Sequence, residues 1–132
     1  MDGGSVGDDQ AAMTIPIADS STIDRLQSYL DRSRGIMTTR AIKPIQCNDG
    51  FTTSVQVGRG LYCSPNSNIG PWSEAEVGYP NIPEPMLWRY AETPGDMSTD
   101  AVYPYVPIEV IAAVIEAHGG FIDESDFHLP QR

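Results

Sequence analysis

The two histidines, His118 and His128, are the side chains of this sequence best suited to acid–base chemistry near neutral pH. A general base also needs a partner that orients it, and the residues around either histidine do not identify one. His118 stands just before Gly119-Gly120 at the end of an apolar stretch, where a cation stabilises the C-terminal end of a helix. We therefore interpret both histidines as structural and expect a protein that is not an enzyme.

Metal and cofactor chemistry is not indicated either. Cys47 and Cys63 do not stand at a metal-binding spacing, and the acidic residues are scattered. In a reducing cytoplasm both thiols are expected to be buried and free, although pairing across neighbouring strands stays open. Gly58-Arg59-Gly60 resembles part of a phosphate loop but lacks the lysine and the following helix. The sequence thus predicts no catalytic residue, no metal and no cofactor.

The distribution of charge is the most informative feature of the sequence. Residues 1–59 hold seven acidic and six basic side chains, whereas residues 60–132 hold eleven acids against Arg89 and Arg132. The second part therefore carries nine of the ten net negative charges. Such a field repels phosphate backbones and attracts basic protein surfaces, so we expect a basic protein partner and no direct binding of nucleic acid.

Most of the aromatic residues lie in the same acidic part of the sequence. Amphipathic aromatics among acids are typical of a protein-binding surface, although core packing with incidental acids explains the same pattern. If they form a surface, the acids are expected to supply a negative strip and one tryptophan an anchor. The candidate contact residues are Trp72, Glu74, Glu76, Glu84, Trp88, Glu92, Asp96 and Asp100.

Two helices are predicted to position these residues. Helix caps at residues 19–22 precede an apolar stripe and predict a helix of about three turns that ends near Gly35. A second helix is predicted from Pro107 to His118. The apolar stripe of the first helix is Ile23, Leu26 and Leu30, with Tyr29 beside it, and the residues expected to share the core face of the second helix are Ile108, Ile111, Ala112 and Ile115.

The region between the helices shows strand patterns. Residues 41–47 and 51–57 flank Asn48-Asp49-Gly50, which is typical of a tight hairpin turn. Alternation over 72–79 predicts a third strand, 86–90 a fourth short strand, and 101–106 a further extended run. The expected fold class is α+β: a small antiparallel sheet of three to four strands with two helices packed on one face. The predicted divisions are a flexible tail at 1–18, one domain at 19–122 and an acidic tail at 123–132.

No stretch of the sequence predicts a membrane span or a secretory signal, so we expect a cytoplasmic protein.

Several segments between about residues 40 and 120 resemble a family of small, acidic, uncharacterised proteins of tailed phages and prophages. They are 49–56, 62–65, 76–80, 90–92, 102–107 and 118–120.

The resemblance implies no active site. It implies a phage accessory protein in a host cell that inhibits a basic bacterial protein, such as a CRISPR effector or another defence complex. The alternatives are a pocket protein that sequesters a small molecule and a virion or assembly component.

Overall fold

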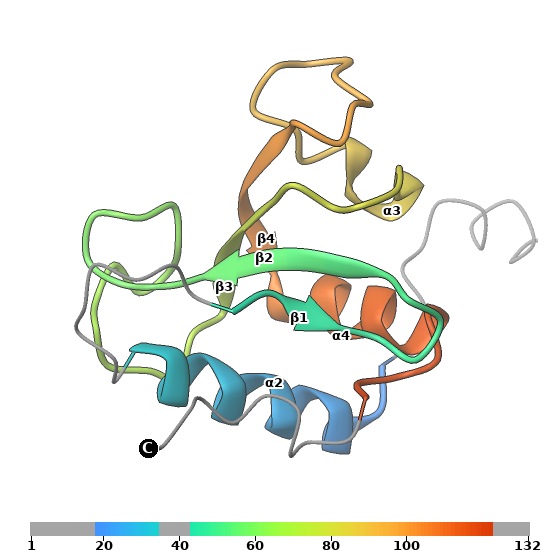
Figure 1. Ribbon diagram of the computed structural model, residues 1–132. Helices are drawn as coiled ribbons and strands as arrows, with labels where there is room; N and C mark the ends of the chain where they lie inside the picture. The colour runs from blue at the N-terminus through green and yellow to red at the C-terminus, as the bar shows by residue number, and fades with distance from the viewer. Residues whose placement is uncertain (1–17, 35–42, 123–132) are drawn as a thin grey trace, which may run out of the picture.

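The computed structural model of the chain describes residues 18–34 and 43–122 (Figure 1). The predicted C-terminal tail, nearly all of the N-terminal tail and the first residues of the first predicted strand lie outside these ranges. The described residues confirm the α+β class, with one four-stranded antiparallel sheet and three helices. The sheet follows chain order, so each strand pairs with its neighbours in the sequence.

The first two strands form the predicted hairpin. β1 (Ile45–Gln46) pairs antiparallel with β2 (Thr52–Gln56), and Gly50 in the connection has a φ of 96°. Glycine suits this conformation because it has no side chain to clash with the backbone. β1 is shorter than expected because Pro44 has no N–H and Cys47 instead forms an isolated bridge with Phe121.

The third strand of the sheet carries two of the candidate acidic residues, Glu74 and Glu76. β3 (Glu74–Gly78) pairs with β2 on one side and β4 (Val102–Pro107) on the other. Its alternation is confirmed in the middle, where Ala75 and Val77 are buried while Glu74 and Glu76 lie on the opposite face. It fails at the ends: Trp72 is buried, and Tyr79 is 60% exposed with a φ of 53°.

Helix α4 (Ile108–Ala117) is the centre of the hydrophobic core and confirms the second predicted helix. It packs against β4 and α2, and all its residues from Val110 to Ile115 are buried, as is Ile108. Gly119 and Gly120 end it with positive φ, while their N–H groups bond to the carbonyls of Glu116 and Ile115. This is a Schellman motif, which satisfies the last carbonyls of the helix.

Helix α2 (Ser20–Arg34) confirms the first predicted helix and is slightly longer than expected. Asp19 caps it by accepting from the N–H of Ser21. Leu26, Tyr29 and Leu30 are buried against the rest of the core. In Figure 1 this helix lies beneath β1 and α4, and it packs against α4.

The expected fourth strand at 86–90 is wrong, because these residues begin in a helix. α3 (Pro85–Trp88) is one short turn with Pro85 in its first turn. Glu84 caps it, since its side chain accepts from the N–H of Met86 at 3.0 Å. A proline at the start and a carboxylate cap favour a helix, and they outweigh the short apolar run that suggested a strand.

Candidate partner-binding surface and a buried histidine centre

The face of the sheet opposite α4 carries the first two candidate glutamates. Glu74 and Glu76 are two residues apart in β3, so both side chains lie on this face. Glu76 accepts a hydrogen bond from the N–H of Tyr62 at 3.1 Å, and Glu74 accepts one from the Ser64 hydroxyl at 2.9 Å. The loop after β2 is thereby held over this acidic face of the sheet.

Two tyrosines lie beside these glutamates. The ring centroids of Tyr62 and Tyr105 are 5.8 Å apart, and the side chains are 42% and 46% exposed. Tyr105 has a φ of 54°, a conformation that costs about 1–3 kcal/mol for a side chain of this size. Its N–H bonds to the carbonyl of Tyr62 at 3.1 Å, which holds the two residues together.

Glu92 completes the cluster from the segment after α3. Its carboxylate lies 3.4 Å from the Tyr62 hydroxyl, which donates to it. The group formed by the exposed Tyr62, Tyr105 and Glu92 and the half-buried Glu74 and Glu76 is called the tyrosine–glutamate surface below. Within the described ranges, none of these three glutamates forms an ion pair with a lysine or arginine. Among the described residues, the hydrogen-bond donors to these glutamates are neutral: the N–H and hydroxyl of Tyr62 and the hydroxyl of Ser64.

Asp96 and Asp100 do not join this surface through any contact. They lie in the connection between α3 and β4, which Figure 1 shows extending beyond α3. Asp96 accepts from the Ser98 N–H at 2.9 Å, and hydrogen bonds from Ser98 lower the pKa of Asp96. Asp100 donates its N–H to the Ser98 hydroxyl. These two acids therefore organise their own turn.

Three other predicted contact residues are buried or half-buried: Trp72, Glu84 and Trp88. Trp72 is only 3% exposed, and its indole N–H donates to the carbonyl of Ser67 at 3.0 Å. Glu84 is 6% exposed because it lies between α3 and α4. Trp88 is half-buried, with an enclosed indole N–H. Trp72 and Glu84 belong to the interior, and between residues 60 and 122 the exposed aromatics are tyrosines.

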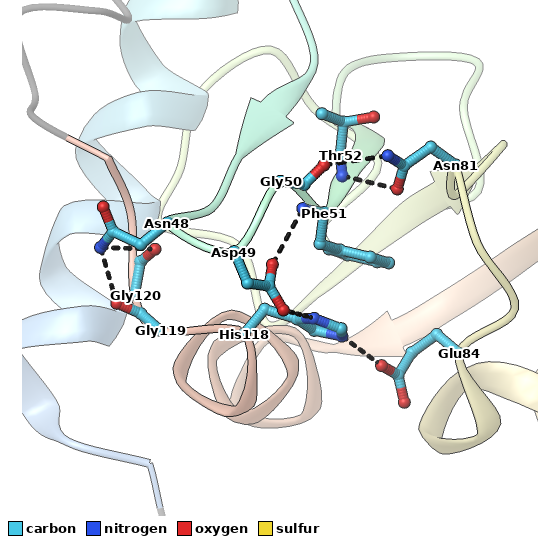
Figure 2. Close-up of polar contacts among 10 residues, drawn as sticks. All are labelled: Asn48, Asp49, Gly50, Phe51, Thr52, Asn81, Glu84, His118, Gly119 and Gly120. Atoms are coloured by element: carbon cyan, nitrogen blue, oxygen red, sulfur yellow. Dashed lines mark hydrogen bonds and ion pairs between the residues drawn. The ribbon is translucent and has the colours of Figure 1, made fainter.

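Glu84 belongs to a centre built around His118 (Figure 2). The imidazole Nδ1 lies 2.6 Å from Asp49 and the Nε2 lies 2.5 Å from Glu84. The ring stacks on Phe51 with a centroid distance of 4.0 Å and an angle of 11°. Asp49 comes from the hairpin turn, Glu84 from the cap of α3 and His118 from the end of α4, so only the fold brings them together.

The surroundings of His118 favour its charged form. Partial burial lowers the pKa of His118, but the hydrogen bonds to Glu84 and Asp49 raise it by more, so it lies above 6.5. The N–H of Phe51, followed by His118, lowers the pKa of Asp49 below 3.8. The C-terminal end of α4 also stabilises a positive charge here.

In the structure both imidazole nitrogens of His118 face carboxylates, so neither presents a free lone pair in this arrangement. His118 lies at the end of α4, as predicted, and its structural role stays a prediction. The sequence analysis did not identify Asp49 or Glu84 as partners of His118. The only local signal was Asp49, and its position in a turn already explains an aspartate there.

The cysteines lie in the core. Cys47 and Cys63 are free and buried, as the sequence indicated. Burial, followed by the nearby Asp49 charge, raises the pKa of Cys47 to about 12. A thiol that stays protonated is a poor nucleophile and a poor metal ligand.

One cavity of the structure can be compared with the alternative function, a pocket that sequesters a small molecule. A cavity of about 330 Å³ lies between α2 and residues 69–72. The alternative would require several aromatics and an arginine, but the lining has one aromatic and no arginine. The lining residues are Gln27, Ser28, Asp31, Ile69, Gly70, Pro71 and Trp72. The hollow does not match the predicted small-molecule site.

Across residues 18–34 and 43–122, no group of three or more histidine, cysteine, aspartate or glutamate side chains could hold a metal ion. Nor is any helix in these two ranges long and apolar enough to cross a membrane. The fold and the surface together define a small α+β protein with an acidic, tyrosine-bearing face. Comparison with protein-family models, curated proteins and solved structures finds no match for this chain.

Proposed function

We propose that this chain is a phage accessory protein that binds and inhibits a basic, nucleic-acid-binding protein of its bacterial host. The partner would be a CRISPR effector or another defence complex, and inhibition would occur in the host cytoplasm without catalysis. The observation that supports the proposal is the tyrosine–glutamate surface. There, two half-exposed tyrosine rings stand beside three glutamates that lack a cationic partner within the described ranges.

This combination suits a basic protein surface for two reasons. Carboxylates attract lysine and arginine over long distances and accelerate association. Tyrosine rings supply contact area with few rotatable bonds, and they attract arginine and lysine by cation–π interaction. A nucleic-acid-binding face offers such cations at high density. Occupying them would exclude the nucleic acid.

The test compares two variants with the same change of charge. In the first, Glu76→Gln and Glu92→Gln remove two of the three charges of the tyrosine–glutamate surface while keeping an oxygen that can accept from Tyr62. In the second, Asp96→Asn and Asp100→Asn neutralise the separate turn. Each immobilised protein is used to retain partners from a bacterial lysate at low and high salt. We expect the first variant to retain roughly one tenth as much partner as wild type, and we expect a far smaller loss for the second variant.

The retained protein is then challenged with duplex DNA. We expect DNA to displace the chain, because both compete for the same cations. Equal retention by the two variants would exclude the tyrosine–glutamate surface as the contact. Failure of DNA to compete would contradict a nucleic-acid-binding target. If a thermal melt shows that the first variant is unfolded, Tyr62→Ala replaces it in the retention experiment.

A further inference from the structure

The His118 centre ties three segments that are distant in the sequence. Its two short contacts reach Asp49 in the hairpin turn and Glu84 at the cap of α3 (Figure 2). His118 itself ends α4, and Phe51 covers one face of its ring. The imidazole thus joins the hairpin, α3 and α4 through a single side chain.

When both carboxylates are ionised, the two contacts can exist together only if the ring carries two protons. A neutral imidazole has one N–H, so it can donate to one carboxylate and must present a lone pair to the other. At 2.5–2.6 Å from a carboxylate oxygen, that lone pair would be repelled. Loss of the proton therefore breaks one of the two contacts.

The contact with Asp49 is the one that can be broken more easily. The Asp49 side chain is 48% exposed, whereas that of Glu84 is 8% exposed. Water can replace the imidazole at Asp49, which also keeps its hydrogen bond from the Phe51 N–H. Glu84 keeps its hydrogen bond from the Met86 N–H, but the oxygen that faces His118 belongs to a buried side chain that water reaches less easily, so losing this contact would cost more.

We propose that His118 is a proton-dependent clasp, which holds the hairpin turn and α3 together on the end of α4 when protonated and releases Asp49 when neutral. This inference goes beyond the proposed function and does not depend on it. It identifies a built-in response of the fold to pH, carried by the contacts of one side chain.

Other polar groups near the clasp do not titrate with it. Asn48 donates to the carbonyl of Gly119 at 2.7 Å, and Asn81 bonds to the N–H of Thr52 and the carbonyl of Gly50, both at 2.9 Å. These amides hold the same turn at every pH (Figure 2).

Three ionisable groups lie around the carboxylates and the helix end. Burial, followed by the charges of Asp96 and Glu84, raises the pKa of Tyr103 in β4 above 10. Cys47, beside the turn, stays a neutral thiol because its pKa is raised to about 12. Glu116, on α4 itself, accepts from the N–H of Asp19 at 2.7 Å. Among the described residues, the charges that act on His118 are those of Asp49 and Glu84.

The sign of the pH effect follows from the raised pKa of His118. The folded state binds the proton more tightly than the unfolded state, so the clasp contributes fully to stability below about pH 6.5. Its contribution is lost as the pH rises through the higher pKa of the folded state. At the acidic end, it is lost again as Asp49 becomes protonated below its ordinary pKa of 3.8.

The test follows the ring protons of His118 by NMR from about pH 5 to pH 9, with His128 as the second histidine in the same spectra. A His128→Gln variant assigns the signals. We expect His118 to titrate above 6.5, and we expect Asp49→Asn and Glu84→Gln each to lower its midpoint. Both substitutions keep an oxygen acceptor and remove one charge.

Unfolding by denaturant over the same pH range supplies the second readout. The difference in stability between wild type and Asp49→Asn should shrink as the pH rises, whereas Asn81→Ala should lower stability by a constant amount. A His118 midpoint at or below 6.5 would overturn the clasp. A difference in stability between wild type and Asp49→Asn that stays constant with pH would also overturn it. This readout concerns only the solvent-exposed contact, so it remains valid whether or not Glu84→Gln folds.

Discussion

Asp49 shows how much depends on a single residue of the hairpin turn. One carboxylate oxygen accepts from the Phe51 N–H and closes the turn, while the other faces His118. The same turn places Phe51 under the imidazole ring. The backbone of the turn therefore sets the geometry of the His118 centre, and a change of the turn conformation is expected to affect both.

Gly50 is the residue at which this can be tested. Its φ of 96° is unfavourable for a β-branched side chain, and no atom lies within 4 Å of the position that a Cβ would take, so the penalty comes from the backbone alone. Gly50→Val is expected to lower the free energy of unfolding by about 1–3 kcal/mol. Chemical denaturation measures it, with Thr52→Val as the control, because strand geometry accepts valine. Equal stability of Gly50→Val and wild type would contradict the turn geometry.

At the scale of elements, α4 determines the packing of the molecule. It is buried on nearly every side because the sheet, α2 and α3 all contact it. Its sequence has few polar residues between Ile108 and Ala117, which agrees with this position. Its C-terminal end carries both the glycine cap and His118, so the helix also fixes the location of the clasp.

Ile111 provides the test of this packing. The side chain is 2% exposed on the face predicted to pack against the sheet. Ile111→Ala is expected to cost about 2–5 kcal/mol of unfolding free energy, because it removes buried methyl groups and leaves a cavity. Glu109→Ala, an exposed position on the same helix, is the matched control. A loss of about 0.5 kcal/mol or less, as for an ordinary surface change, would show that this face is not packed.

At the scale of the whole molecule, the net charge of −10 opposes contact with phosphate backbones. We expect no binding to duplex DNA or RNA at low salt, measured by fluorescence anisotropy of a labelled duplex. A basic DNA-binding protein serves as the positive control. Tight binding of the duplex would contradict both this prediction and the proposed function, whereas its absence leaves the competition experiment as the decisive test of the partner.

The sequence by itself predicted the features that depend on neighbouring residues. The hairpin at Asn48-Asp49-Gly50, the alternation of Ala75 and Val77, and the helix after Pro107 follow from turn chemistry and periodicity. Each of these signals acts within one element. The segment 86–90 failed because an apolar run of this length suits either a strand or a helix, and the cap by Glu84 decided the outcome.

Only the tertiary structure decided which side chains meet. His118 lies 69 residues from Asp49 and 34 from Glu84, and no periodicity links positions so far apart. The tertiary structure also brought Glu76 and Glu92 to the same tyrosine, Tyr62, and left Asp96 and Asp100 in a separate turn. It placed Trp72 in the core. The physical reason is that composition fixes the total charge and apolar content, whereas the packing of elements fixes which groups are desolvated together and which remain in water.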